Sequence, residues 1–149
     1  MTQAAAGGTT LSDHHTKLDR LARWGRVGWG VVYVAGSLDH LYLAGFSTET
    51  YRSIAEWGHA PAWVQQAWDS IFMAHPSVYG AMVATYEMGI GLLMLKGGRA
   101  AVLGLWGAIA FHVGLLFLGS FLWPYTLPAL ALLAVIVRAQ MKAVESNRQ

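Results

Sequence analysis

Apolar blocks long enough to cross a bilayer constrain this chain more than any other feature. Charged residues make up only 12% of its 149 residues, about half the share of an ordinary soluble domain. The charges gather near the N-terminus, at 47–70, at 96–99 and after residue 137. One bilayer core needs roughly 20 apolar residues per helix. The sequence therefore predicts an all-α fold, an integral membrane bundle of four transmembrane helices.

The predicted spans are the apolar blocks between the charge clusters. They cover about residues 21–46, 76–95, 100–120 and 125–139. Residues 1–16 are small and polar and lack the apolar segment of a cleavable signal peptide, so we expect a disordered tail. The transmembrane domain is expected over 17–142, followed by a polar C-terminal tail at 143–149.

The segment between the first two spans, residues 47–72, mixes tryptophans with polar residues. Gly58 and Pro61 divide it, and Trp57, Trp63 and Trp68 recur along it. Tryptophan is enriched where lipid headgroups meet water. We expect two short amphipathic helices that lie on the membrane surface.

Basic residues predict the orientation of the chain in the membrane. Four spans place both termini on one side, and nine of the ten Lys and Arg residues then fall on that side, with only Arg52 on the other. Since cytoplasmic segments carry the excess of Lys and Arg, we expect a cell membrane protein with both termini in the cytoplasm. Because these residues flank spans and the net charge is only +2, the expected partner is the lipid bilayer and no nucleic acid.

Four ionisable residues interrupt the predicted spans: Asp39, His40, Glu87 and His112. A charge at the centre of a membrane helix costs about 2.5–3.5 kcal/mol on insertion scales. Such residues therefore face the interior of the bundle. At 1.5 Å per residue they lie at mid-depth or somewhat toward the outer side. We expect them to form one polar cluster in the outer half of the bundle.

Small residues share a helical face with each ionisable group, as expected where membrane helices approach closely. The second span has Gly80, Ala84, Glu87 and Gly91 at such spacing, and the third has Gly104, Ala108, His112 and Gly119. In the first span the face is Gly25, Gly28, Val32, Gly36 and either Asp39 or His40.

A Glu–His pair in a membrane can hold or pass a proton, or bond the carbonyl oxygens of a quinone. The candidate site for proton or quinone handling is Glu87 with His112, His40 and Asp39. The competing interpretation is that these residues only fix helix packing. Lesser alternatives are a haem with His40 and His112 as axial ligands, or a His/Glu/Asp metal site, and we assign no metal ligand. Cysteine is absent, which excludes disulfides and thiolate chemistry.

The middle of the chain, AHPSVYGAMVATYEMGIGLLMLKGGRAAVLGLWGAIAF, resembles the DoxX family of small four-helix membrane proteins. The matching positions are Pro76, Gly80, Glu87, Gly91, Leu92, Leu93, Gly97 and Arg99. The resemblance covers about residues 24–140. It implies a membrane subunit associated with redox or thiol-stress complexes, and it implies no particular residue role.

We therefore expect a membrane subunit of a redox-associated complex, quinone-linked or active in thiol or oxidative stress, with an intramembrane Glu/His pocket. Whether the chain is itself an enzyme stays open. The expected partners are other membrane or peripheral redox proteins, and a homo-oligomer is a further alternative. The rival interpretation is a non-catalytic membrane anchor or assembly subunit. A small proton-coupled carrier is the third, although no internal repeat supports it.

Overall fold

The computed structural model describes residues 11–146, and in that range every regular element is a helix. The helices are α1 (Leu11–Phe46), α2 (Glu49–Gly58), α3 (Ala62–Ala67), α4 (Pro76–Lys96), α5 (Gly98–Phe117) and α6 (Trp123–Ser146). A π-helical turn, Trp68–Phe72, follows α3, and a 3-10 turn, Ser120–Leu122, precedes α6. The expectation of an all-helical chain is confirmed for these residues.

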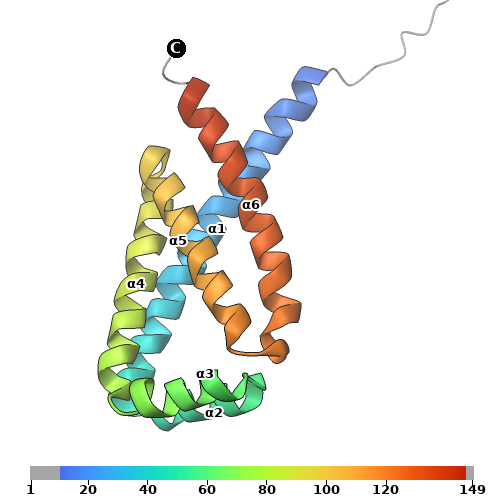
Figure 1. Cartoon of the computed structure of the whole chain (residues 1–149). Coiled ribbons are helices and arrows are strands. Elements are labelled where there is room, and N and C mark those ends of the chain that lie inside the picture. The colour runs from blue at the N-terminus through green and yellow to red at the C-terminus, as the bar shows by residue number, and fades with distance from the viewer. Residues whose placement is uncertain (1–10, 147–149) are drawn as a thin grey trace, which may run out of the picture.

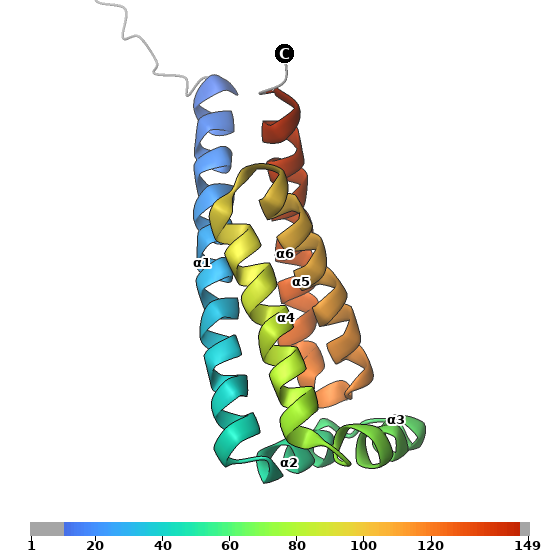
Figure 2. The same cartoon turned by 90° about the vertical axis from the view of Figure 1, so that its left-hand side faces the viewer.

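The long helices α1, α4, α5 and α6 run side by side, and α2 and α3 lie across one end of them (Figure 1). The first and last described residues both lie at the opposite end (Figure 2). There α1 and α6 extend beyond the turn that joins α4 to α5. The molecule thus has two different ends, a helical cap formed by α2 and α3 and an end with the two termini.

Three helical segments are long and apolar enough to cross a membrane: Pro76–Lys96, Gly98–Phe117 and Ser120–Ser146. At 1.5 Å per residue, the 21 residues of α4 extend roughly 31 Å, about the thickness of the hydrocarbon core. Large apolar side chains cover their outer surfaces, including Val78, Leu92, Leu103, Trp106 and Val135. Such a surface suits lipid and indicates a membrane protein.

Glycines bring α1 and α4 into close contact. A Cβ atom added to Gly91 would lie 2.9 Å from the carbonyl oxygen of Gly30, and one added to Gly30 would lie 3.2 Å from the Gly91 oxygen. Further along, a Cβ atom on Gly80 would lie 3.0 Å from the Ala44 Cβ atom. The two backbones therefore stay close from Gly30 to Ala44, where any larger residue would separate them.

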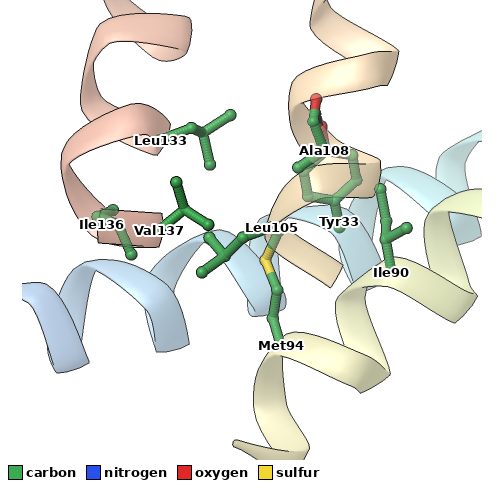
Figure 3. Packing of buried hydrophobic residues seen from close by; sticks show 8 residues of the cluster. All are labelled: Tyr33, Ile90, Met94, Leu105, Ala108, Leu133, Ile136 and Val137. Carbon is green, nitrogen blue, oxygen red and sulfur yellow. Dashed lines mark hydrogen bonds between the residues drawn. The ribbon is translucent and has the colours of Figure 1, made fainter. Parts of the chain in front are cut away.

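The apolar core residues that pack together in Figure 3 lie on the side of Glu87 that is nearer the termini, as the directions of the helices in Figure 2 show. The core draws on all four long helices: Tyr33 from α1, Ile90 and Met94 from α4, Leu105 and Ala108 from α5, and Leu133, Ile136 and Val137 from α6. Met94, Leu105 and Leu133 are completely buried. Next to this core, Arg26 donates a hydrogen bond to the Met94 carbonyl. The Arg26 guanidinium group thus provides a hydrogen-bond donor for a carbonyl oxygen in the last turn of α4, where the helix itself offers none.

One hydrogen bond joins two parts of the α2–α3 cap, and one close contact attaches the cap to the α5–α6 turn. The Trp68 indole nitrogen donates to the Tyr51 carbonyl oxygen at 3.0 Å. Gly58 meets the α5–α6 turn so closely that a Cβ atom on Gly119 would lie 1.7 Å from the Gly58 oxygen. Gly119 has a φ of +120°, a conformation that glycine adopts easily.

The predicted helix boundaries hold for some elements and are wrong for others. The span expected at 76–95 and the two short helices divided near Gly58 and Pro61 are found as predicted. However, α1 begins at Leu11, so residues 11–16 are helical and not a disordered tail, whereas residues 1–10 lie outside the described range. Helix α6 continues to Ser146, seven residues beyond 139 and into the predicted polar tail. These extensions are rich in charged and polar residues, which continue a helix in water but end an apolar block.

Candidate functional site

Glu87 lies on the buried face of α4. The predicted face is confirmed, since Gly80, Ala84, Glu87 and Gly91 are all buried. Gly36 of α1 makes room for the carboxylate, because a Cβ atom added there would lie 3.1 Å from Glu87 Oε2. Close helix packing therefore brings the acid against the backbone of α1.

His40 is the basic group nearest to Glu87. Its Nε2 atom lies 3.9 Å from Glu87 Oε2, and the two side chains are 22% and 7% exposed. Glu87 Oε2 is buried and accepts no hydrogen bond from residues 11–146. The pair is thus close enough for strong electrostatic interaction but too far apart for a direct hydrogen bond.

Tyr51, from the α2–α3 cap, holds the other side of the His40 ring. The phenol oxygen lies 3.2 Å from His40 Nδ1 and donates to the His40 carbonyl oxygen at 3.0 Å. The two rings are parallel within 2°. The Tyr51 hydroxyl group has one proton and donates it to the His40 carbonyl oxygen. We therefore assign a proton to His40 Nδ1, which donates it to the Tyr51 hydroxyl oxygen. His40 Nε2 then presents its lone pair, or a proton when the ring is charged, toward Glu87.

The environment of Tyr51 is buried and negatively charged. Tyr51 is only 1% exposed, and Gly80 leaves space for its hydroxyl group, which would lie 2.5 Å from a Cβ atom there. Burial raises the pKa of the Tyr51 phenol, and the negative charges of Asp39 and Glu87 raise it further. The phenol is therefore a neutral hydrogen-bonding group at physiological pH.

His112 forms a second polar centre on α5. Its Nδ1 atom lies 2.9 Å from both the Tyr33 hydroxyl oxygen and the Ala108 carbonyl oxygen. The rings of Trp29 and Tyr125 pack against it, with centroids 5.4 and 5.6 Å away. Its Nε2 atom is buried and has no hydrogen-bond partner among residues 11–146. The imidazole thus has one engaged nitrogen and one free nitrogen inside an aromatic enclosure.

Two hydroxyl groups on the long helices are also buried. Ser37 of α1 is 1% exposed and Thr126 of α6 is fully buried. Neither side-chain oxygen has a hydrogen-bond partner within the described range. Five buried polar atoms thus lack a hydrogen-bond partner within the described range. Arg26 Nε lies near the C-terminal end of α4, and the other four, one from each long helix, are Ser37 Oγ, Glu87 Oε2, His112 Nε2 and Thr126 Oγ1.

The expected cluster of four residues is found only in part. His40 lies next to Glu87, and His112 is buried as predicted but bonds Tyr33. Asp39 is a correction, since its side chain is exposed on α1 and does not join the buried groups. The reason is geometric, because successive helix residues point about 100° apart, so His40 and Asp39 cannot both face Glu87.

The small-residue faces are also partly corrected. Gly104, Ala108 and His112 are buried on α5 as predicted. Gly119 lies beyond the end of α5 and contacts the cap. On α1, Val32 is exposed, and a Cβ atom on Gly28 would meet nothing within 4 Å. Gly30, absent from the predicted face, makes the close contact with α4.

The donor atoms do not fit an axially ligated haem. One ring nitrogen of His40 contacts Tyr51 and the other faces Glu87, so neither is directed at an iron atom. His112 has one nitrogen without a partner in the described range, Nε2, but one imidazole cannot supply both axial ligands of the expected haem. Among the side chains that the structure describes, in residues 20–54 and 56–146, no group of three or more His, Cys, Asp or Glu is arranged for a metal ion.

Sequence reasoning missed four contributors to the site: Tyr33, Ser37, Tyr51 and Thr126. A signal existed for two of them, because Tyr33 and Ser37 precede His40 by seven and three residues and so share its face. If His40 and not Asp39 is taken to face the interior, the helical period predicts that Tyr33 and Ser37 face it too. For Tyr51 and Thr126 no local pattern exists, because their contacts join segments that are separate in the sequence.

Comparisons with models of known protein families, with curated proteins and with solved structures find no match to this chain.

Proposed function

We propose that the chain crosses the cell membrane four times, with α1 as the fourth span. Helix α4 has the length and composition of a span, and α1 follows it closely from Gly30, opposite Gly91, to Ala44, opposite Gly80. A helix that stays in contact with a span over this distance passes through the same thickness of bilayer. Lateral contact with α4 compensates for the polar residues that lower the hydropathy of α1.

We further propose that both termini are cytoplasmic. The two described ends of the chain lie together, opposite the α2–α3 cap (Figure 2). The uneven distribution of Lys and Arg supports a cytoplasmic location for this end of the molecule. The cap, with exposed Trp57 and Trp63, lies at the outer headgroup layer.

Within this arrangement, we propose that the protein is a membrane subunit of a redox-associated complex, linked to quinone or to the thiol and oxidative stress response. The observation that carries the proposal is the buried Glu87 carboxylate, which faces His40 and has an oxygen without a hydrogen-bond partner among the described residues. A buried acid next to an imidazole is suited to exchange a proton with a redox partner. The free oxygen leaves a position for a substrate hydroxyl or carbonyl group.

The alternative, a non-catalytic anchor or assembly subunit, also has an observation in its favour. Tyr51 links the cap to α1 through both the ring and the carbonyl of His40. That contact would stabilise the fold even if no proton moved. In this interpretation the Glu87–His40 pair serves only to set the packing of α1 on α4.

Replacing Glu87 with Gln separates the two functions, because it keeps the shape of the side chain and removes the titratable proton. For the redox subunit we expect normal assembly and a loss of quinone-dependent activity of the complex by about 100-fold or more, the usual contribution of a positioned acid or base. Activity would be measured in membranes, and assembly by co-purification in mild detergent. Glu56→Gln is the matched control, since it makes the same chemical change at an exposed carboxylate in α2. Equal activity of Glu87→Gln and wild type would favour the anchor.

A further inference from the structure

Contacts made by nearby residues indicate that Ser37 Oγ, Glu87 Oε2, His112 Nε2 and Thr126 Oγ1 lie at a similar level along the four long helices. Gly36, the neighbour of Ser37, contacts the Glu87 carboxylate. Ser37 is one helical turn from Tyr33, which bonds His112. Thr126 directly follows Tyr125, whose ring packs on the His112 ring. Ser37, Glu87, His112 and Thr126 come from four different helices and are linked by contacts of residues next to them or one helical turn away.

The two hydroxyl groups in this set do not satisfy themselves on their own helices. Serine and threonine in a helix commonly donate to the carbonyl oxygen four residues earlier. Ser70 and Thr85 do so here, at 2.6 and 2.8 Å. Ser37 and Thr126 do not, although both are almost completely buried. Their hydroxyl groups are therefore available to a ligand in the interior.

Toward the end with the termini, this level is closed by apolar side chains. The core residues that follow Glu87 on α4, precede His112 on α5 and follow Thr126 on α6 are Ile90, Met94, Leu105, Leu133, Ile136 and Val137. Figure 3 shows them meeting in the space between the helices. Exposure is 5% or less for each of them. Arg26 lies beyond this layer, at the C-terminal end of α4.

Toward the cap, the same level continues into polar groups. His40 faces Glu87 with one ring nitrogen and contacts the Tyr51 hydroxyl group with the other. The His40 side chain is 22% exposed, whereas the side chains on the opposite side are closed. Polar side chains therefore follow Glu87 on the side of the cap, and apolar side chains follow it on the other side.

We propose that Ser37, Glu87, His112 and Thr126 form a binding site for ordered water, which exchanges with solvent on the cap side alone. Water is the ligand class that fits, because the site mixes an anionic acceptor, two hydroxyl groups and an imidazole nitrogen, and water can donate to and accept from all of them. Protons then reach Glu87 from the side of α2 and α3 past His40. This inference rests on the membrane-spanning part of the proposed function and is independent of the redox part.

The natural absence of cysteine makes the site directly testable with single cysteines. Ser37→Cys and Thr126→Cys place a thiol of similar size in the proposed water site. Leu133→Cys, at an equally buried position in the apolar layer, is the matched control. Ala62→Cys, exposed near the start of α3, and Ala143→Cys, exposed near the end of α6, report the side of the membrane.

Silver ion is the probe, because it is small, travels in water and binds thiolates. It would be added to one side of sealed, oriented membrane vesicles, and the remaining thiols would be counted by mass spectrometry after alkylation in denaturant. We expect the Ser37→Cys and Thr126→Cys proteins to lose their free thiol when silver is on the side of Ala62→Cys, and to keep it when silver is on the side of Ala143→Cys. The Leu133→Cys thiol should survive both treatments.

Two results would overturn the inference. Survival of both site thiols, equal to that of Leu133→Cys, would show that water does not reach the site. Loss of the site thiols from the side of Ala143→Cys would show that the apolar layer does not close it. Gel filtration identifies a variant that fails to fold. If either Ser37→Cys or Thr126→Cys fails to fold, the other of the two variants decides the result. Neither outcome depends on the quinone-dependent activity, which the Glu87→Gln variant tests separately.

Discussion

At the scale of single residues, Tyr51 has more than one structural role. Its hydroxyl group binds the His40 ring and carbonyl, and its own carbonyl accepts from Trp68. It thus connects the surface cap to the residue that faces Glu87. A phenol in a buried position with two hydrogen bonds is a costly group to remove, because its partners stay buried without it.

Tyr51→Phe should lower the free energy of unfolding by about 1–3 kcal/mol, the cost of leaving buried polar groups unsatisfied. Thermal unfolding in mild detergent measures the change. Tyr42→Phe is the control, since Tyr42 is 60% exposed and its variant should unfold at the wild-type temperature. A stable Tyr51→Phe protein would show that the phenol contributes only packing.

The same residue gives a prediction about alkaline pH. The pKa of Tyr51 is raised in the folded protein by burial and by Asp39 and Glu87, whereas an unfolded tyrosine loses its proton near pH 10. Above that pH the unfolded state binds fewer protons than the folded state, so stability falls as pH rises. The wild type should therefore lose more stability between pH 9 and about 11 than Tyr51→Phe does. Parallel pH profiles of the two proteins would contradict this expectation.

At the scale of helices, the crossing of α1 and α4 depends on two glycines. Gly30 and Gly91 place their backbones so close that a Cβ atom on Gly91 would lie 2.9 Å from both the Gly30 oxygen and a Val34 methyl group. Neither contact can relax by rotation of a flexible side chain, because one is backbone and the other a β-branched residue. The position of His40 relative to Glu87 follows from this crossing.

Gly91→Ala should destabilise the protein by about 1–3 kcal/mol through overpacking. Gly89→Ala is the matched control on the same helix, because a Cβ atom there meets nothing within 4 Å. It should be neutral or slightly stabilising, since alanine favours helix. Thermal unfolding of both variants in one detergent gives the comparison. Equal stability of the two would show that α1 and α4 are not in close contact at Gly91.

The attachment of the cap can be tested in the same way. Gly119→Ala puts a methyl group against the Gly58 carbonyl and into a positive φ, so we expect α2 and α3 to detach from the α5–α6 turn. Limited proteolysis should then cut residues 47–72 faster than in the wild type. Gly114→Ala in α5 is the control, because a Cβ atom there has open space. Unchanged proteolysis of Gly119→Ala would rule out this contact as the attachment.

At the scale of the whole molecule, the number of spans decides where the termini lie. Composition alone identifies three spans, and three spans would place the termini on opposite sides of the membrane. The proposed fourth span, α1, places them on the same side. Protease added to intact cells should therefore leave tags at both termini uncut, and permeabilised cells should lose both. A tag removed from intact cells at one end only would reject α1 as a span.

Much of this architecture could be predicted from the sequence, because the periodic small residues of α4 and α5 report their buried faces without ambiguity. Glu87 and His112 were placed correctly for that reason. In α1 the pattern is ambiguous, because its glycines lie on several sides and only Gly25, Gly30 and Gly36 have close neighbours. The orientation of Asp39 and His40 therefore needed the tertiary structure. The contact of Tyr51 with His40 joins separate helices, which local periodicity does not encode.

The continuity of α1 has a consequence for which side chain lies opposite Glu87. The helix runs unbroken from Leu11 to Phe46, so a rotation of its N-terminal end would be transmitted along the helix to His40. A turn of about 100° around the axis is one residue step, and it would exchange the imidazole of His40 for the carboxylate of Asp39. The glycine contact with α4 fixes the rotation of α1, and so determines that the imidazole and not the carboxylate lies opposite the acid.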